Sequence, residues 1–306
     1  MTAQPQGSRR RLVEIPLGTV PANQPFPRSR WDSGVPDVRR IRRDEFYTGL
    51  LFMGFANGLV EKILHEVAAD GLAASAFHTF GISVFEWAAI GAGLALLWGA
   101  DPRPLRRFDF AVGALAAISF LVPVPALALV AVSAICLYLV VAAQTPQPLG
   151  RGARILLAAT LPLLWVRLLL ATVGNIFMSA DATMVGLVVG TPVNGNAIQF
   201  ADGSGFMVLG PDCSSLTNVS IAILCMVLFV EVKGCRWSWR IARFAVMGCA
   251  AAVAVNIARV SLIGLYPQYF SLLHGPVGAT IADWTTILAI LTICSRGTTH
   301  HEQAPA

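Results

Sequence analysis

Residues 110–150 read FAVGALAAISFLVPVPALALVAVSAICLYLVVAAQTPQPLG and contain no aspartate, glutamate, lysine or arginine. A helix needs about 20 apolar residues to cross the hydrocarbon core of a bilayer, and this run has room for two. Pro123 and Pro125 stand at its centre, where a proline interrupts a helix. The stretch therefore predicts two membrane-spanning helices joined by a turn.

The average composition of the chain shows the same bias, although it is not spread evenly along the sequence. Of the 306 residues, 56% are apolar and 13% are charged, whereas a soluble domain carries about a quarter charged residues. We expect an all-α, polytopic membrane protein with about eight transmembrane helices, at 46–60, 76–99, 110–122, 126–143, 155–177, 214–230, 244–265 and 276–294. The predicted organisation is a disordered arginine-rich tail at 1–43, a helical domain at 44–296 and a short tail at 297–306.

The distribution of positive charge predicts the orientation. If the amino terminus is cytoplasmic and the chain crosses eight times, 19 of the 22 lysines and arginines lie on the cytoplasmic side and only Lys62 lies outside. Such an asymmetry is typical of membrane proteins. We therefore expect a multi-pass protein of the cell (inner) membrane that contacts lipids, has both termini in the cytoplasm and has no nucleic-acid partner.

One long connection, 178–213, is expected on the extracytoplasmic side. It begins amphipathic and then reads as a short β-hairpin, with strands at 196–200 and 206–209 around the turn Asp202-Gly203-Ser204-Gly205. Connections of this length are often functional. The candidate site is therefore sought on this face.

Cys213 is the only one of six cysteines expected on the outer side. It precedes Ser214 and Ser215 at the expected first turn of a spanning helix, where the helix dipole favours the thiolate. The other cysteines are expected to pack as small apolar residues. No Cys-x-x-Cys or Cys/His zinc spacing occurs, so no metal or cofactor is expected.

Two further ionisable residues are predicted near Cys213. Arg259 lies inside the span 244–265, about 9 Å below its outer end, and Asn256 shares its helix face. His274 immediately precedes the last span, in which Asp283 is expected at the depth of Arg259 and is predicted to orient it. A thiol, an imidazole and a guanidinium form a complete set of groups for acyl transfer.

The segments Asp212-Cys213-Ser214-Ser215-Leu216 and Asn256-Ile257-Ala258-Arg259-Val260, followed by His274, resemble the signature regions of the exosortase/archaeosortase family in order and spacing. Residues 190–209 also resemble its extracytoplasmic loop. The resemblance implies a membrane transpeptidase that cleaves C-terminal sorting signals of exported, PEP-CTERM-like proteins. It further implies that Cys213 is the nucleophile and that Arg259 and His274 are its essential partners. The family usually has glycine where this chain has Ser215, a difference that bears on the signal recognised.

A transporter or channel is the main alternative. Glu86 and Arg167 are expected near the middle of their spans, and buried charges often mark transport paths. The two side chains are alternatively expected to pair with each other across helices 76–99 and 155–177.

Two protease classes are disfavoured. Ser204, the candidate serine nucleophile to act with His274, lies in a sequence that a hairpin turn requires. His65-Glu66 and His78 do not form a His-Glu-x-x-His helix, the pattern of a zinc protease.

Overall fold

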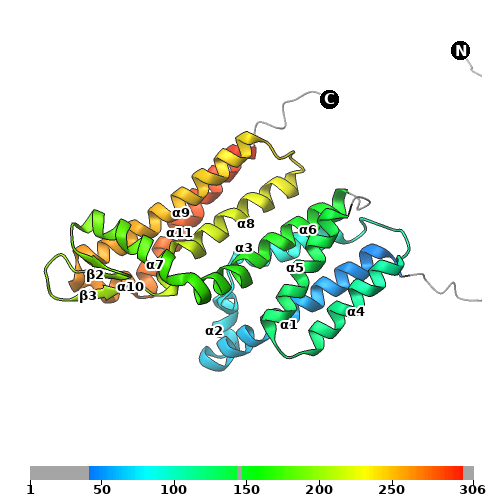
Figure 1. Cartoon of the computed structure of the whole chain (residues 1–306), viewed down its shortest axis with the longest axis horizontal. Coiled ribbons are helices and arrows are strands. Elements are labelled where there is room, and N and C mark those ends of the chain that lie inside the picture. The colour runs from blue at the N-terminus through cyan, green and yellow to red at the C-terminus, as the bar shows by residue number, and fades with distance from the viewer. Residues whose placement is uncertain (1–40, 143–146, 299–306) are drawn as a thin grey trace, which may run out of the picture. The chain divides into compact units, whose positions relative to one another are not determined.

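The computed structural model describes residues 41–142 and 147–298, which are mostly helical (Figure 1). Most of the predicted amino-terminal tail and residues 299–306 of the second tail lie outside these ranges. Arg43 does not belong to a tail, because it is the first residue of helix α1 (Arg43–Asp70) and its side chain is only 1% exposed.

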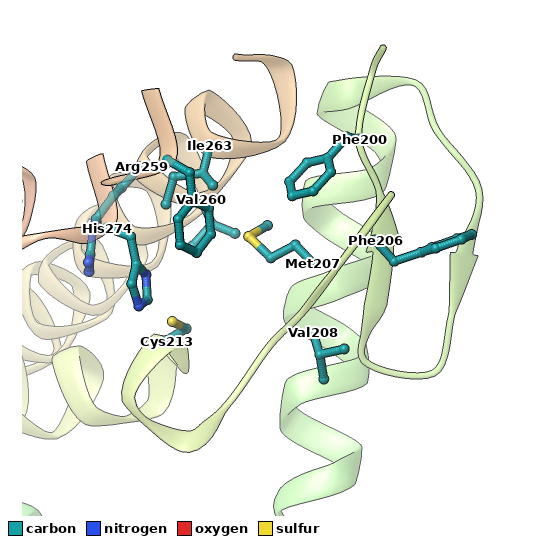
Figure 2. Close-up of a pocket in the computed structure, with 10 residues that line it drawn as sticks. Phe200, Phe206, Met207, Val208, Cys213, Arg259, Val260, Ile263 and His274 are labelled. Carbon is teal, nitrogen blue, oxygen red and sulfur yellow. The ribbon is translucent and has the colours of Figure 1, made fainter. Parts of the chain in front are cut away.

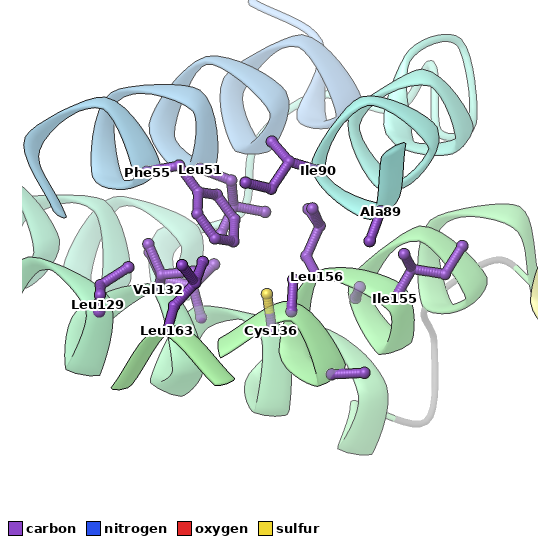
Figure 3. Close-up of a cluster of buried hydrophobic side chains, with 14 of the residues drawn as sticks. Leu51, Phe55, Ala89, Ile90, Leu129, Val132, Cys136, Ile155, Leu156 and Leu163 are labelled. Atoms are coloured by element: carbon purple, nitrogen blue, oxygen red, sulfur yellow. The ribbon is translucent and has the colours of Figure 1, made fainter. Parts of the chain in front are cut away.

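The first helices pack around one hydrophobic cluster (Figure 3). They are α1, α3 (Val84–Leu97), α4 (Arg107–Leu121), α5 (Pro125–Val141) and α6 (Gln147–Thr160). Leu51 and Phe55 of α1 meet Val132 of α5 and Leu156 of α6 in this cluster. The predicted turn at the paired prolines is confirmed, since α4 ends at Leu121 and α5 begins at Pro125.

The expectation of one continuous helix over 76–99 is wrong. The segment divides into α2 (Leu72–Phe77), the 3₁₀ turn η1 (Thr79–Gly81) and α3. Ser83 and Glu86 start the new helix with a capping box, in which Ser83 N–H donates to Glu86 Oε2 at 2.7 Å and Glu86 N–H donates to Ser83 Oγ at 3.2 Å. Glu86 therefore lies in the first turn of α3 and not near the middle of a span.

Helix 155–177 is longer than expected. Residues Gln147–Val189 form a helical stretch of 43 residues, composed of α6, a π-helical segment at Leu161–Trp165 and α7 (Val166–Val189). Pro162 lies in the π segment, where its missing N–H disrupts the regular hydrogen-bond pattern. The connection expected at 178 consequently begins only at Gly190, which ends α7 in a left-handed conformation.

Four helical stretches in the described part of the chain are long and apolar enough to cross a membrane. They are Gln147–Val189, α8 (Ser215–Lys233), α9 (Trp239–Leu265) and Val277–Thr298 of α11 (Pro276–Thr298). The other predicted spans fall on helices that are shorter or less apolar, among them α3 with 14 residues and α5 with 17. Length and composition thus indicate a membrane protein with four such stretches, fewer than the eight expected.

A small antiparallel sheet follows α7. Strands β1 (Val193–Asn194), β2 (Ala197–Gln199) and β3 (Phe206–Val208) lie in that order, and Ile198 of β2 is paired with Met207 of β3. Strands β2 and β3 lie where the sequence predicted a hairpin, and β1 adds a third strand. Ile198 and Met207 pack against α7 and α9 in a second hydrophobic cluster, which fixes the sheet beside these helices.

Two ionic clusters join helices away from the sheet. Arg43 Nε lies 3.1 Å from Asp109 Oδ2, and Arg43 Nη1 lies 3.3 Å from Asp101 Oδ2. Arg154 Nε of α6 lies 2.6 Å from Glu231 Oε1 of α8. Arg43 and Arg154 are among the positive charges that predict the orientation of the chain. In the fold, their ion pairs also connect neighbouring helices.

Candidate active site

Cys213 lies immediately before α8. It is the last residue of a 3₁₀ turn, η3 (Pro211–Cys213), and Ser214 is the N-cap of α8, with Ser214 Oγ accepting the N–H of Leu216 at 3.3 Å. The cysteine is therefore outside the first helical turn in which the sequence placed it. Its side chain is half-buried and faces the sheet and α9.

Two side chains from other helices hold the backbone around Cys213. Asn256 of α9 donates from Nδ2 to the carbonyl oxygen of Cys213 at 2.8 Å and to Ser215 Oγ at 3.0 Å. Asp181 of α7 accepts the N–H of Ser215 at 2.8 Å and the hydroxyl of Ser214 at 3.2 Å, both at Oδ2. Ser215 thus takes part in this anchoring through both its N–H and its hydroxyl oxygen.

Sequence reasoning included Asn256 but missed Asp181. Asp181 is only 4% exposed, and it is the only acid between Ile155 and Ala201. An isolated acid in an apolar helix could have indicated this anchoring role, because a buried carboxylate requires hydrogen-bond donors.

Arg259 and His274 are linked through the segment between α9 and α11. Arg259 is half-buried, and its Nε donates to the carbonyl oxygen of Leu273 at 3.5 Å. His274 ends the short helix α10 (Phe270–His274) and stacks on Phe270, with ring centroids 5.0 Å apart and an interplanar angle of 22°. Phe270, another residue that the sequence did not indicate, thus restricts the orientation of the imidazole.

Cys213, Arg259 and His274 line a single cavity of about 340 Å³. Figure 2 shows the thiol, the imidazole and the guanidinium next to one another on one side, with Phe200 and Met207 on the side of the sheet. In the described residues, no hydrogen bond joins the thiol to the imidazole. The two groups therefore face one cavity without a hydrogen bond between them.

Comparisons of the chain with protein-family models, curated proteins and solved structures find no match.

Asp283 is not paired directly with Arg259. Within the described ranges, no ion pair of 4.0 Å or less joins them, although their charges interact at longer range. Asp283 lines a second cavity, which also contains Glu86 and Arg167. Whether Asp283 orients Arg259 through this longer-range interaction stays a prediction.

The expected pair of Glu86 and Arg167 is also absent from the ion pairs of the described residues. The Glu86 carboxylate is used in the capping box of α3. A charge at the first turn of a helix is stabilised by the helix dipole and by free backbone donors. Its presence consequently does not require a transport path.

Proposed function

We propose that the chain is a membrane-embedded cysteine transpeptidase of the exosortase type, which cleaves C-terminal sorting signals of exported proteins at the extracytoplasmic membrane face. One observation carries the proposal. Cys213 before α8, Arg259 on α9 and His274 at the end of α10 are separated in sequence, yet they line one cavity.

The three groups supply the steps of an acyl transfer. The Cys213 thiolate attacks the carbonyl carbon of the scissile peptide bond, and the guanidinium of Arg259 stabilises the oxyanion that forms. The C–N bond then breaks, His274 protonates the leaving amine, and a thioester joins the client to Cys213. An acceptor nucleophile gives its proton to His274, attacks the thioester and releases the cysteine sulfur.

The distance of the cavity from the basic ends of α8 and α9 matches the length of the apolar helix in a sorting signal. Arg259 is 20 residues after Trp239, the first residue of α9, a distance of about 30 Å along the helix and therefore about the thickness of a bilayer core. Lys233, Arg236 and Arg240 lie near the opposite ends of α8 and α9. A peptide bond next to a spanning helix of the client would meet Cys213 at the outer surface.

The proposed topology has eight crossings and both termini in the cytoplasm. The crossing elements are α1, α3, α4, α5, the continuous α6–α7 stretch, α8, α9 and α11. We expect a membrane-impermeant maleimide to label Cys213 in intact cells but to label Cys235 only after permeabilisation. Cys213→Ser and Cys235→Ser variants identify the labelled position, and labelling of Cys235 in intact cells would reverse the orientation.

The enzymatic assignment is tested with a client protein from the same genome that ends in a short motif, an apolar helix and a basic cluster. Cys213→Ala should lower the processing rate by about 10⁴-fold or more, as removal of a catalytic nucleophile does. Cys249→Ala is the matched control and should process normally, because Cys249 is on α9 outside the cavity. Full processing by Cys213→Ala, as a transporter or scaffold would allow, refutes the nucleophile assignment.

A further inference from the structure

A second cavity, of about 760 Å³, lies among the end of α1, the start of α3, and α7, α8 and α11. Its wall is largely apolar and includes Phe85, Leu170, Trp284 and Ile287. Two cations, Lys62 and Arg167, also line it. The cavity thus combines an extended apolar surface with two cationic side chains, and the acids Glu86 and Asp283 line it as well.

Neither cation forms an ion pair of 4.0 Å or less in the part of the chain that the structure describes. Arg167 has neither a hydrogen bond nor an ion pair of 4.0 Å or less within residues 41–142 and 147–298. Lys62 Nζ donates to the carbonyl oxygen of Gly81, which brings no charge. Lys62 and Arg167 are like charges that line the same cavity, so they repel each other. An anion between the two side chains would remove this repulsion.

In the described residues, none of the acids near these cations forms an ion pair of 4.0 Å or less with them. Glu86 interacts with both cations at longer range, but its Oε2 accepts the backbone N–H of Ser83. Glu66 faces only Lys62 of the pair. Asp283 also lines this cavity, and its charge interacts with that of Arg259 of the first cavity. The one acid that interacts with both cations, Glu86, is therefore already used as a helix cap.

The depth of the cations matches the surface of a bilayer. Lys62 is 19 residues after the start of α1, and Arg167 is 20 residues after the start of α6. Both intervals correspond to about 30 Å of helix, the thickness of the hydrocarbon core. If α1 and α6 begin at one membrane surface, Lys62 and Arg167 reach the level of the phosphates at the other.

We propose that Lys62 and Arg167 bind the phosphate of a phospholipid whose acyl chains lie against the apolar wall of this cavity. Arginine and lysine are the residues that most often bind phosphate oxygens. The volume and the apolar wall favour a lipid over free phosphate, which would leave most of the cavity unfilled. The proposal requires only that the chain is embedded in a membrane and does not depend on catalysis by Cys213.

The test is a titration of the purified full-length protein in detergent with phosphatidylglycerol, followed by native mass spectrometry. Lys62→Gln with Arg167→Gln should weaken binding by about tenfold or more, since two charge-assisted contacts are lost. Lys62→Arg with Arg167→Lys keeps both charges and should retain binding. Lys233→Gln with Arg236→Gln removes the same charge at the other end of α8 and should bind normally.

Parallel arms identify the ligand. Diacylglycerol, which lacks the phosphate, should bind at least about tenfold more weakly than phosphatidylglycerol, and inorganic phosphate should not displace the lipid at equal concentration. Equal binding of phosphatidylglycerol to the Gln variant and the native protein overturns the proposal, as does equal binding of diacylglycerol. The proposal is also overturned if the Gln variant loses binding of the client peptide but binds the lipid undiminished. That result would assign the cavity to the peptide. The same titration is repeated with Cys213→Ala, which should bind phosphatidylglycerol as the native protein does. A failure of the lipid proposal is thereby distinguished from a failure of the proposed enzymatic function.

Discussion

Asp181 offers the most direct test of how the site is held. Its Oδ2 accepts the N–H of Ser215 and the hydroxyl of Ser214, and its side chain is buried. Hydrogen bonds to a charged group contribute about 1.5–3 kcal/mol each. Asp181→Ala removes both acceptor contacts at a place that water reaches poorly, so we expect a loss of about 3 kcal/mol in the free energy of unfolding. Asp181→Asn keeps an acceptor oxygen but loses the charge, and should cost about 1 kcal/mol.

The same substitution should impair processing. Ser214 and Ser215 follow Cys213 directly, and a displacement of about 1 Å in a catalytic group can cost about 10²-fold in rate. We expect Asp181→Ala to reduce client processing by about 10- to 100-fold and to change the rate at which a maleimide labels Cys213. Both rates are measured at a temperature at which circular dichroism shows the variant to be folded.

Asp202→Ala is the matched control. Asp202 is exposed in the loop between β2 and β3, where its Oδ1 accepts the N–H of Ser204 at 2.9 Å. Its loss should leave thiol labelling and client processing within about twofold of the native protein, as is usual for surface substitutions. Native stability, labelling and processing in Asp181→Ala would refute the anchoring role.

Three further outcomes are expected. Asp283→Asn should reduce client processing less than Arg259→Ala does, because the charges of Asp283 and Arg259 interact without an ion pair; equal losses in the same assay would contradict a supporting role. Asp109→Ala should lower the free energy of unfolding in a detergent denaturation assay by about 3 kcal/mol, since it removes the nearest carboxylate of the buried Arg43; an unchanged midpoint would disprove this. Burial of Asp101 acts to raise the pKa of its carboxyl group. Hydrogen bonds donated by Arg103 and Arg43 act in the opposite direction and outweigh burial, so the pKa of Asp101 lies below its ordinary value of 3.8. The stability from this carboxylate is therefore complete above about pH 4 and lost as the pH falls through its folded pKa; a thermal midpoint at pH 3 equal to that at pH 6 would contradict it.

The helical character and the main helix borders near the site were readable from the sequence. Hydropathy located α8, α9 and α11, because a helix that crosses a bilayer must be apolar along its length. The prolines between α4 and α5 marked their turn. Local signals of this kind act within one segment and need no knowledge of neighbours.

Apolar runs did not reveal where helices break or continue. The capping box of Ser83 and Glu86 divides 76–99, whereas α7 continues to Val189 through a segment expected to be a loop. Hydropathy averages over many residues and does not register a cap formed by two of them. It also gave more spans than the four long apolar helical stretches found in the described residues.

The sequence by itself named Cys213, Arg259 and His274, because a thiol, a guanidinium and an imidazole each stood out from apolar surroundings. Only the tertiary structure decided that they line one cavity, that Asp181 and Asn256 hold the backbone beside the cysteine, and that Asp283 lies in another cavity. These relations depend on how helices are rotated against their neighbours. That rotation is set by packing between segments distant in the chain, so no local pattern encodes it.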